Sequence, residues 1–273
     1  MDSKYIIGII IAIIVIVGAY LVLAGGSNQN TINIAGSTSV QPVAQKLADA
    51  YMKDHPNVKI TVQGGGSAVG LSSVNQGTAQ IGTYSSKLAA NDSAGITQTQ
   101  IANDGVAIIV NSANPISSLT VAQVAGIYEG NTTNWNQVGG SDAKITVVTR
   151  EAGSGTRDAV TKLALGGQNI TNTAIVQSST GAVVQAVQGD PNAIGYASLA
   201  DIKNSTVKAL VINGITPSAS TVQSAQYPLT RPFLFLTKGS PSGAVQDFIN
   251  FVLSPQGQTI VNQSGAVPIK PTS

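Results

Sequence analysis

Short apolar segments alternate with amphipathic segments along most of this chain, and this alternation is the feature that most constrains its fold. The first unit has an apolar segment at 31–35, a Gly/Ser/Thr loop, and then apolar residues at helical spacing from Val40 to Tyr51. Strands that alternate with helices are typical of α/β folds with mostly parallel sheets. The pattern therefore predicts an α/β fold whose loops follow the carboxyl ends of strands, where ligands bind in such folds.

The same unit recurs to the end of the chain. We expect further strands at 58–62, 80–83, 106–110, 145–149, 193–196 and 233–236, and helices at 68–75, from Thr156 to Leu165, at 180–187 and at 245–253. About 245 residues are enough for two lobes of usual domain size. We place lobe 1 at 31–108 plus 201–273 and lobe 2 at 109–200, with a ligand cleft between them.

The N-terminus carries one long apolar segment. Residues 5–24 are uncharged, Lys4 precedes them, and the polar linker 25–30 follows them. Twenty helical residues span about 30 Å, which is the thickness of the hydrocarbon core of a bilayer. We expect 1–24 to be one transmembrane anchor, with the rest of the chain outside the cytoplasm. The alternative is a signal peptide that is removed near Ala24.

Composition argues against several classes of function. Charged residues make up 10% of the chain, the net charge is +2, and Lys and Arg form no cluster, so we expect no nucleic-acid partner. The chain has no cysteine and one histidine, His55, which argues against metal sites and a Ser-His-Asp triad. Neither a phosphate-binding P-loop nor a dinucleotide fingerprint is present. We expect a binding protein without a cofactor rather than an enzyme.

Three loops share one design, in which a strand is followed by Gly, Ser and Thr residues and then by a helix. They are Gly36-Ser37-Thr38-Ser39, Gly64 to Ser67, and Gly153-Ser154-Gly155-Thr156. A helix N-terminus offers unpaired N–H groups and a partial positive charge, and hydroxyls add further donors. One such loop is most simply explained as a helix cap. Three of them at the same edge of a sheet predict an oxyanion site.

Arg150 directly precedes the third loop. A guanidinium group suits a tetrahedral oxyanion, because it makes two parallel charge-assisted hydrogen bonds. The alternative is a surface ion pair with the neighbouring Glu151. We expect Arg157 to lie outside the pocket on the following helix.

These loops resemble the signature loops of the phosphate-binding proteins of ABC-type phosphate importers. The resemblance rests on 36–42, 64–67 and 150–157, with support from 127–130, Trp135 and 192–198, and it runs over most of 31–268. It implies a two-lobed, type II-like periplasmic-binding-protein fold that closes over a dehydrated phosphate ion. It also implies a monomer at the cell membrane, with the binding domain outside the cytoplasm, that delivers inorganic phosphate to an ABC-type permease.

The resemblance also implies the residues that contact phosphate. They are Ser37, Thr38, Ser39 and Ser67 from the first lobe, Arg150, Ser154, Gly155 and Thr156 from the second, and one of Ser85 and Ser86. The last pair stays open, because the segment 80–86 is one residue longer than the family pattern.

The pocket departs from the family in its carboxylates. Many relatives have one at the position of Ser85 or Ser86, and another two residues after the arginine, where this chain has Ala152. A carboxylate accepts a proton from phosphate and repels the fully ionised sulfate. We expect phosphate to be preferred through another acceptor. A receptor for sulfate or molybdate, a phosphate-ester hydrolase and a phosphate-sensing module are the alternatives.

Overall fold

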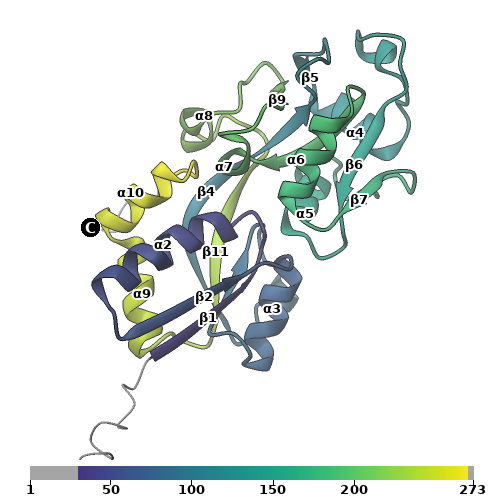
Figure 1. Cartoon of the computed structure of the whole chain (residues 1–273). Helices are drawn as coiled ribbons and strands as arrows, with labels where there is room; N and C mark the ends of the chain where they lie inside the picture. Colours follow the sequence, from purple (N-terminus) through teal and green to yellow (C-terminus); the bar gives the residue numbers. More distant parts are fainter. Residues whose placement is uncertain (1–29, 270–273) are drawn as a thin grey trace, which may run out of the picture.

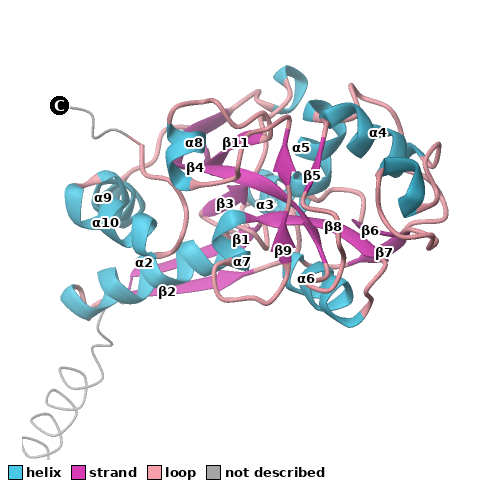
Figure 2. Cartoon of the chain, turned by 90° about the horizontal axis from the view of Figure 1, so that it is seen from above, coloured by secondary structure: helices cyan, strands magenta, loops and turns pink. Residues whose placement is uncertain are grey.

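The computed structural model describes residues 30–269 (Figure 1). The expected anchor at 1–24 therefore lies outside the described residues. Between residues 30 and 269, every helix is too short or too polar to cross a membrane. Strands occupy the middle of the molecule and helices lie on both sides of them (Figure 2).

The first lobe is built on a parallel set of strands. The central strand β1 (Asn30–Gly36) pairs with β2 (Val58–Gln63) on one side and with β3 (Ile81–Tyr84) on the other. Helix α2 (Gln41–Asp54) connects β1 to β2, and α3 (Ser67–Gln76) connects β2 to β3. Each connection is a strand, a loop and a helix, as the sequence predicted.

Helix α3 packs very close to the sheet, and glycine makes this possible. A Cβ atom added to Gly82 would lie 2.5 Å from the backbone oxygen of Gly70, and one added to Gly70 would lie 2.6 Å from the backbone oxygen of Thr83. No side chain fits in this contact, because real Cβ atoms do not approach other atoms so closely. The two glycines therefore fix the position of the helix that begins at Ser67.

Two antiparallel strands, β4 (Ile96–Val110) and β11 (Thr230–Lys238), run between the lobes (Figure 1). Strand β11 pairs with β3 in the first lobe, and the last five residues of β4 pair with β8 (Ala193–Ser198) in the second. The sequence predicted only 106–110 of β4, because those residues form a continuous apolar run. The first half of β4 is more polar and is partly exposed.

The second lobe repeats the strand–loop–helix arrangement. Strand β6 (Thr146–Arg150) lies parallel to both β8 and β7 (Ile175–Gln177). The helices of this lobe are α4 (Val121–Glu129), α5 (Gly155–Leu163) and α6 (Thr180–Gly189). Smaller elements complete the described chain: η1 (Ala90–Asp92), β5 (Ser118–Leu119), η2 (Trp135–Val138), α7 (Leu199–Ile202), β9 (Lys208–Ala209), β10 (Val211–Ile212), α8 (Ala219–Gln223), α9 (Gly243–Leu253) and α10 (Pro255–Gln263).

The α/β class is confirmed, but the expectation of mostly parallel sheets is only partly right. Strand pairs within each lobe are parallel, whereas β4 and β11 pair antiparallel with their neighbours. The sheet order β2-β1-β3-β11-β4-β8-β6-β7 is therefore mixed. The cause is that β4 and β11 carry the chain from one lobe to the other and back.

The buried apolar residues form separate clusters in the two lobes. One cluster joins β1, β2 and β3 to α2, α9 and α10, and includes Leu47 and Phe248. Another joins α4, β6 and α5 around Trp135 and Tyr128. Residues of 210–229, which the sequence analysis assigned to lobe 1, lie in this second cluster. The boundary between the lobes at residue 200 stays a prediction.

Candidate functional site

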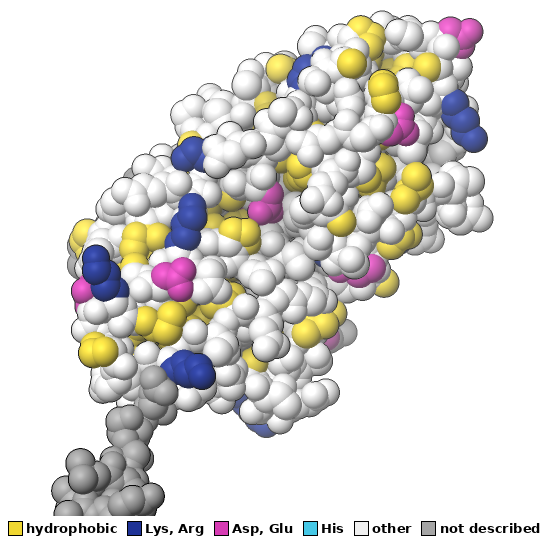
Figure 3. Space-filling model, in the orientation of Figure 1, with side chains coloured by type: hydrophobic (Ala, Val, Ile, Leu, Met, Phe, Trp, Pro, Cys, Tyr) yellow, Lys and Arg dark blue, Asp and Glu magenta, His cyan; other side chains and the backbone are white. Residues whose placement is uncertain are grey.

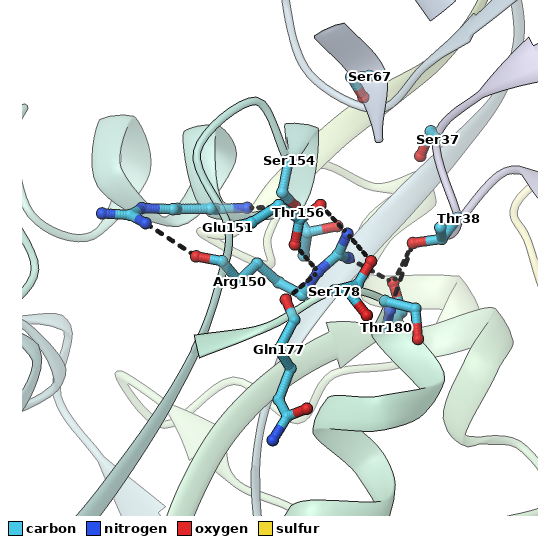
Figure 4. Close-up of polar contacts among 12 residues, drawn as sticks. Ser37, Thr38, Ser67, Arg150, Glu151, Ser154, Thr156, Gln177, Ser178 and Thr180 are labelled. Carbon is cyan, nitrogen blue, oxygen red and sulfur yellow. Dashed lines mark hydrogen bonds and ion pairs between the residues drawn. The ribbon is translucent and has the colours of Figure 1, made fainter. Parts of the chain in front are cut away.

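The three Gly/Ser/Thr loops meet at the junction of the two lobes (Figure 4). On the first-lobe side, the Ser37 hydroxyl donates a hydrogen bond to the Ser85 Oγ at 2.8 Å, and the Ser85 backbone N–H donates to the Ser67 Oγ at 3.2 Å. All three serines are buried, with at most 3% of their surface exposed. Loops after β1, β2 and β3 therefore share one buried cluster of hydroxyl groups.

Hydroxyls of the second lobe complete this cluster. The Ser39 Oγ lies 2.9 Å from the Thr156 Oγ1 and 2.9 Å from the Thr180 Oγ1, and the Thr38 Oγ1 lies 3.3 Å from the Thr180 Oγ1. The Ala68 N–H also donates across the lobes to the Gly153 carbonyl at 3.0 Å. The two lobes thus contact each other directly, so the structure describes a closed arrangement.

Helix capping explains only part of these hydroxyls. Ser154 caps α5, since its Oγ accepts a hydrogen bond from the Arg157 N–H. The helices α2 and α3 begin without any side-chain cap, so Ser37, Ser39 and Ser67 are not caps. The first N–H groups of a helix have no acceptor within the helix. Here the N–H groups of Gln41 and Ala68 donate to the Ser37 and Gly153 carbonyls. The capping interpretation is therefore right for Ser154 alone among the predicted serines.

Arg150 lies at the end of β6 with 1% of its surface exposed. Its Nε and Nη2 donate to both carboxylate oxygens of Glu151, at 2.8 and 2.7 Å, and its Nη1 donates to the Thr180 Oγ1 at 3.1 Å. The ion pair with Glu151 is thus present, but it belongs to a buried arginine rather than to a surface pair. Glu151 holds the guanidinium group so that Nη1 reaches the hydroxyl cluster.

The structure separates Ser85 from Ser86. The Ser85 hydroxyl belongs to the cluster, whereas the Ser86 hydroxyl donates to the Asp158 carboxylate at 2.5 Å. Arg157 lies on α5, and its Nη1 donates to the Arg150 carbonyl at 2.8 Å. Its place outside the phosphate pocket stays a prediction. Arg157 lines a cavity of about 290 Å³ beside the third loop, together with Tyr84 and Asp158.

Thr180 is a residue of this cluster that the sequence analysis did not identify. It is 1% exposed, and its hydroxyl contacts Thr38, Ser39 and Arg150. A signal was present, because Ser178-Ser179-Thr180-Gly181 follows a strand and precedes a helix, which is the design of the other three loops. The strand itself, β7, has three residues, and this is why the unit was missed.

Arg231 on β11 is the second residue that was missed. Its Nη1 donates to the Thr156 Oγ1 at 2.8 Å and to the Ser85 carbonyl at 3.0 Å. Its Nε donates to the Asp104 Oδ2 at 2.9 Å, and Asp104 also accepts from the Ser198 hydroxyl at 2.6 Å. Nothing local in the sequence marks this group, since its members come from three strands far apart along the chain.

The charges near the site are buried rather than spread over the surface. On the face shown in Figure 3, the charged side chains are scattered singly. Burial raises the pKa of Asp104, while Arg231, Ser198 and the Leu199 backbone N–H oppose this rise. An anion at the cluster would therefore meet arginines whose positive charges are little screened by water.

Within the described residues, the buried carboxylate oxygen Oδ2 of Asp201, on α7, has no hydrogen-bond partner. Burial, and next the nearby charge of Asp104, raise the pKa of Asp201 from 3.8 to about 8, against the opposing effect of Arg231 and Arg150. The folded state therefore keeps a proton that the unfolded state loses between about pH 4 and pH 8. The contribution of Asp201 to stability therefore falls as pH rises through this window.

We expect Asp201→Asn to remove this loss of stability. Each unit of pKa shift corresponds to about 1.4 kcal/mol, so the variant should gain at least about 2 kcal/mol over the natural chain at pH 8 relative to pH 5. Urea denaturation of both proteins at pH 5, 6.5 and 8 measures the difference. Parallel pH profiles of the two proteins would contradict the expectation.

The comparisons with known proteins agree with this fold. A family model described as a PBP superfamily domain matches residues 23–256. The phosphate-binding protein PstS of Bacillus subtilis (strain 168) is 32% identical over 243 residues, which cover 88% of this chain and 81% of the relative. PstS of Borreliella burgdorferi is 31% identical over 255 residues, which cover 89% of this chain and 91% of the relative.

Solved structures show the same likeness. A Clostridium perfringens protein crystallised with bound phosphate matches with a TM-score of 0.85 at 36% identity, covering 88% of this chain and 100% of that chain. An ABC-type phosphate transport receptor from Vibrio cholerae matches with a TM-score of 0.74 at 36% identity, covering 87% and 100%.

The fold and the hydroxyl cluster at the junction define a two-lobed binding protein. The chain belongs to the PBP superfamily and, within it, to the family of the phosphate-binding protein PstS.

The structure brings most of the predicted site residues together. Those around the junction of the lobes are Ser37, Thr38, Ser39, Ser67, Ser85, Arg150, Ser154, Gly155 and Thr156. Ser86 also lies at the junction, but its hydroxyl donates to Asp158 on α5 and not to the cluster. Their contact with phosphate stays a prediction.

Proposed function

We propose that this chain binds inorganic phosphate between its two lobes, outside the cytoplasm, and delivers it to an ABC-type permease. The relatives that resemble it over most of its length are described as phosphate-binding proteins or phosphate transport receptors, and one of them was crystallised with phosphate. The proposal includes a single N-terminal anchor in the membrane and action as a monomer.

One observation in the structure carries the proposal. Hydroxyl groups from both lobes lie within 2.8–3.4 Å of one another, and the guanidinium group of Arg150 reaches the same cluster. Phosphate oxygens accept hydrogen bonds from hydroxyls, backbone N–H groups and guanidinium groups. A dehydrated tetrahedral anion would replace the bonds between hydroxyls by stronger, charge-assisted bonds to itself.

The closed arrangement suggests how binding would be coupled to the lobes. Ser39 of the first lobe contacts Thr156 and Thr180 of the second. An anion held by all three would bridge the lobes, so that it would bind the closed state better than the open one. Closure would then present a different outer surface to the permease. Of the two serines left open by the sequence, we propose Ser85 as the phosphate contact.

Isothermal titration calorimetry tests the proposal on the detergent-solubilised full-length chain. We expect phosphate to bind at least about tenfold more tightly than sulfate, corresponding to a difference of about 1.4 kcal/mol. The acceptor that favours phosphate is expected to be a hydroxyl lone pair or a carbonyl, because this chain has Ala152, and either Ser85 or Ser86, where the resemblance implies carboxylates in many relatives.

Titrations with sulfate and molybdate, and with a chromogenic phosphate ester, serve as comparisons. Sulfate binding within tenfold of phosphate would change the assignment to a general oxyanion receptor. Turnover of the ester would favour the hydrolase alternative. A pull-down from membranes with the full-length chain tests the partner. Capture of a membrane kinase instead of a permease would favour a sensory role.

A further inference from the structure

Arg231 lies on β11, one of the two strands that join the lobes, and 2% of its surface is exposed. Its Nη1 donates one hydrogen bond to each lobe, to the Ser85 carbonyl at 3.0 Å and to the Thr156 Oγ1 at 2.8 Å. Ser85 and Thr156 both belong to the hydroxyl cluster. A second buried guanidinium group therefore reaches the proposed phosphate site. It comes from the strands β4 and β11 that join the lobes, here called the hinge, and not from a loop.

The hydrogen-bond donors of Arg231 are not all used. Its Nε donates to the Asp104 Oδ2 at 2.9 Å. Its Nη2 lies 2.8 Å from the same oxygen, but no group in the described chain accepts a hydrogen bond from it. Nη2 thus has an ion-pair contact with Asp104 but no well-aligned hydrogen bond, so the N–H groups of Nη2 are incompletely used. Arg231 is thus a buried cation with spare donor capacity beside hydroxyls that contact one another.

Asp104 fixes this guanidinium group. Its carboxylate is fully buried, receives the Arg231 Nε and accepts the Ser198 hydroxyl at 2.6 Å. Each arginine near the cluster is thus held by one carboxylate: Arg150 by Glu151, and Arg231 by Asp104. Neither carboxylate is hydrogen-bonded to a hydroxyl of the predicted site loops, so an anion there would meet guanidinium groups first.

We propose that Arg231 is a second phosphate-binding arginine, which donates to the anion from the hinge, and that Asp104 is its positioning residue. This inference rests on the proposed function and deepens it. On binding, a phosphate oxygen becomes an acceptor for the Arg231 amino groups beside Thr156. Because Arg231 bonds to Ser85 and Thr156 together, its full contact with the anion requires the lobes to be closed.

Calorimetry with inorganic phosphate on the full-length chain tests the inference. Arg231→Gln is expected to raise the Kd for phosphate at least 30-fold, since it removes charge-assisted bonds. Arg231→Lys keeps the charge but loses the planar guanidinium group. Its Kd for phosphate should lie between those of Arg231→Gln and the natural chain. The matched control is Lys162→Gln, which removes a positive charge from an exposed pair with Asp158 and should leave the Kd within twofold.

A second variant covers the case in which breaking the buried pair unfolds the protein. Asp104→Leu combined with Arg231→Met replaces both partners by apolar side chains, which buried ion pairs often tolerate. Thermal melting without phosphate shows which variants are folded. A folded single or double variant with a Kd within threefold of the natural chain overturns the inference and leaves the proposed function intact. Absence of phosphate binding by the natural chain overturns both.

Discussion

Replacing Gly155 with alanine is expected to abolish tight phosphate binding while each lobe stays folded. A Cβ atom at this position would lie 2.3 Å from the Ser67 Oγ and 2.6 Å from the Ser85 Oγ. Both serines belong to the first lobe, whereas Gly155 begins α5 in the second. Alanine suits a helix, so the conflict acts between the lobes and not within the helix. The variant should be unable to close.

The expected size of the effect is an increase of at least about 100-fold in the Kd for phosphate, or about 2.7 kcal/mol. Gly181→Ala is the matched control, because Gly181 lies in the first turn of α6 and a Cβ atom there meets nothing within 4 Å. Calorimetry gives the two affinities, and small-angle scattering with and without phosphate reports closure. A Gly155→Ala variant that binds within threefold of the natural chain would show that the lobes do not close as the structure has them.

The sequence predicted the strand–loop–helix units well, because each unit is encoded locally. The apolar spacing from Val40 to Tyr51 became α2, and the glycines before Ser67 became the loop that precedes α3. It predicted the connections between lobes poorly. The first half of β4 is stabilised by pairing with β11, which lies more than 100 residues further along the chain, and no local pattern records such a pairing.

The site residues also divide into those marked by local sequence and those placed by contacts far along the chain. Hydroxyls in Gly/Ser/Thr loops were identified because a strand before and a helix after them can be read in the sequence. Thr180 was missed because the strand before it, β7, has only three residues and gives little pattern in the sequence. Arg231 was missed because its place beside Thr156 and Ser85 depends on how the two lobes are joined. Ser85 and Ser86 became distinct only once Asp158 was seen to accept the Ser86 hydroxyl.

Arg150→Ala is expected to have the second large effect. The structure gives Arg150 one donor in the hydroxyl cluster, Nη1, because Nε and Nη2 are held by Glu151. Phosphate would thus lose one or two charge-assisted bonds, each contributing about 1.5–3 kcal/mol. It would also face the uncompensated carboxylate of Glu151. Together these changes should raise the Kd for phosphate at least about 100-fold.

The fold should survive this change better than the loss of Arg231. The side chain of Glu151 is 30% exposed, so water can solvate its carboxylate when Arg150 is removed, whereas Asp104 is fully buried. Melting temperature and calorimetry on the same samples separate the two effects. Glu151→Gln is the companion variant, since it keeps an acceptor for the guanidinium group and should change the Kd less than tenfold. An unchanged Kd in Arg150→Ala would remove Arg150 from the site, and the hydroxyl cluster would then have to hold its anion with Arg231 as its one guanidinium group.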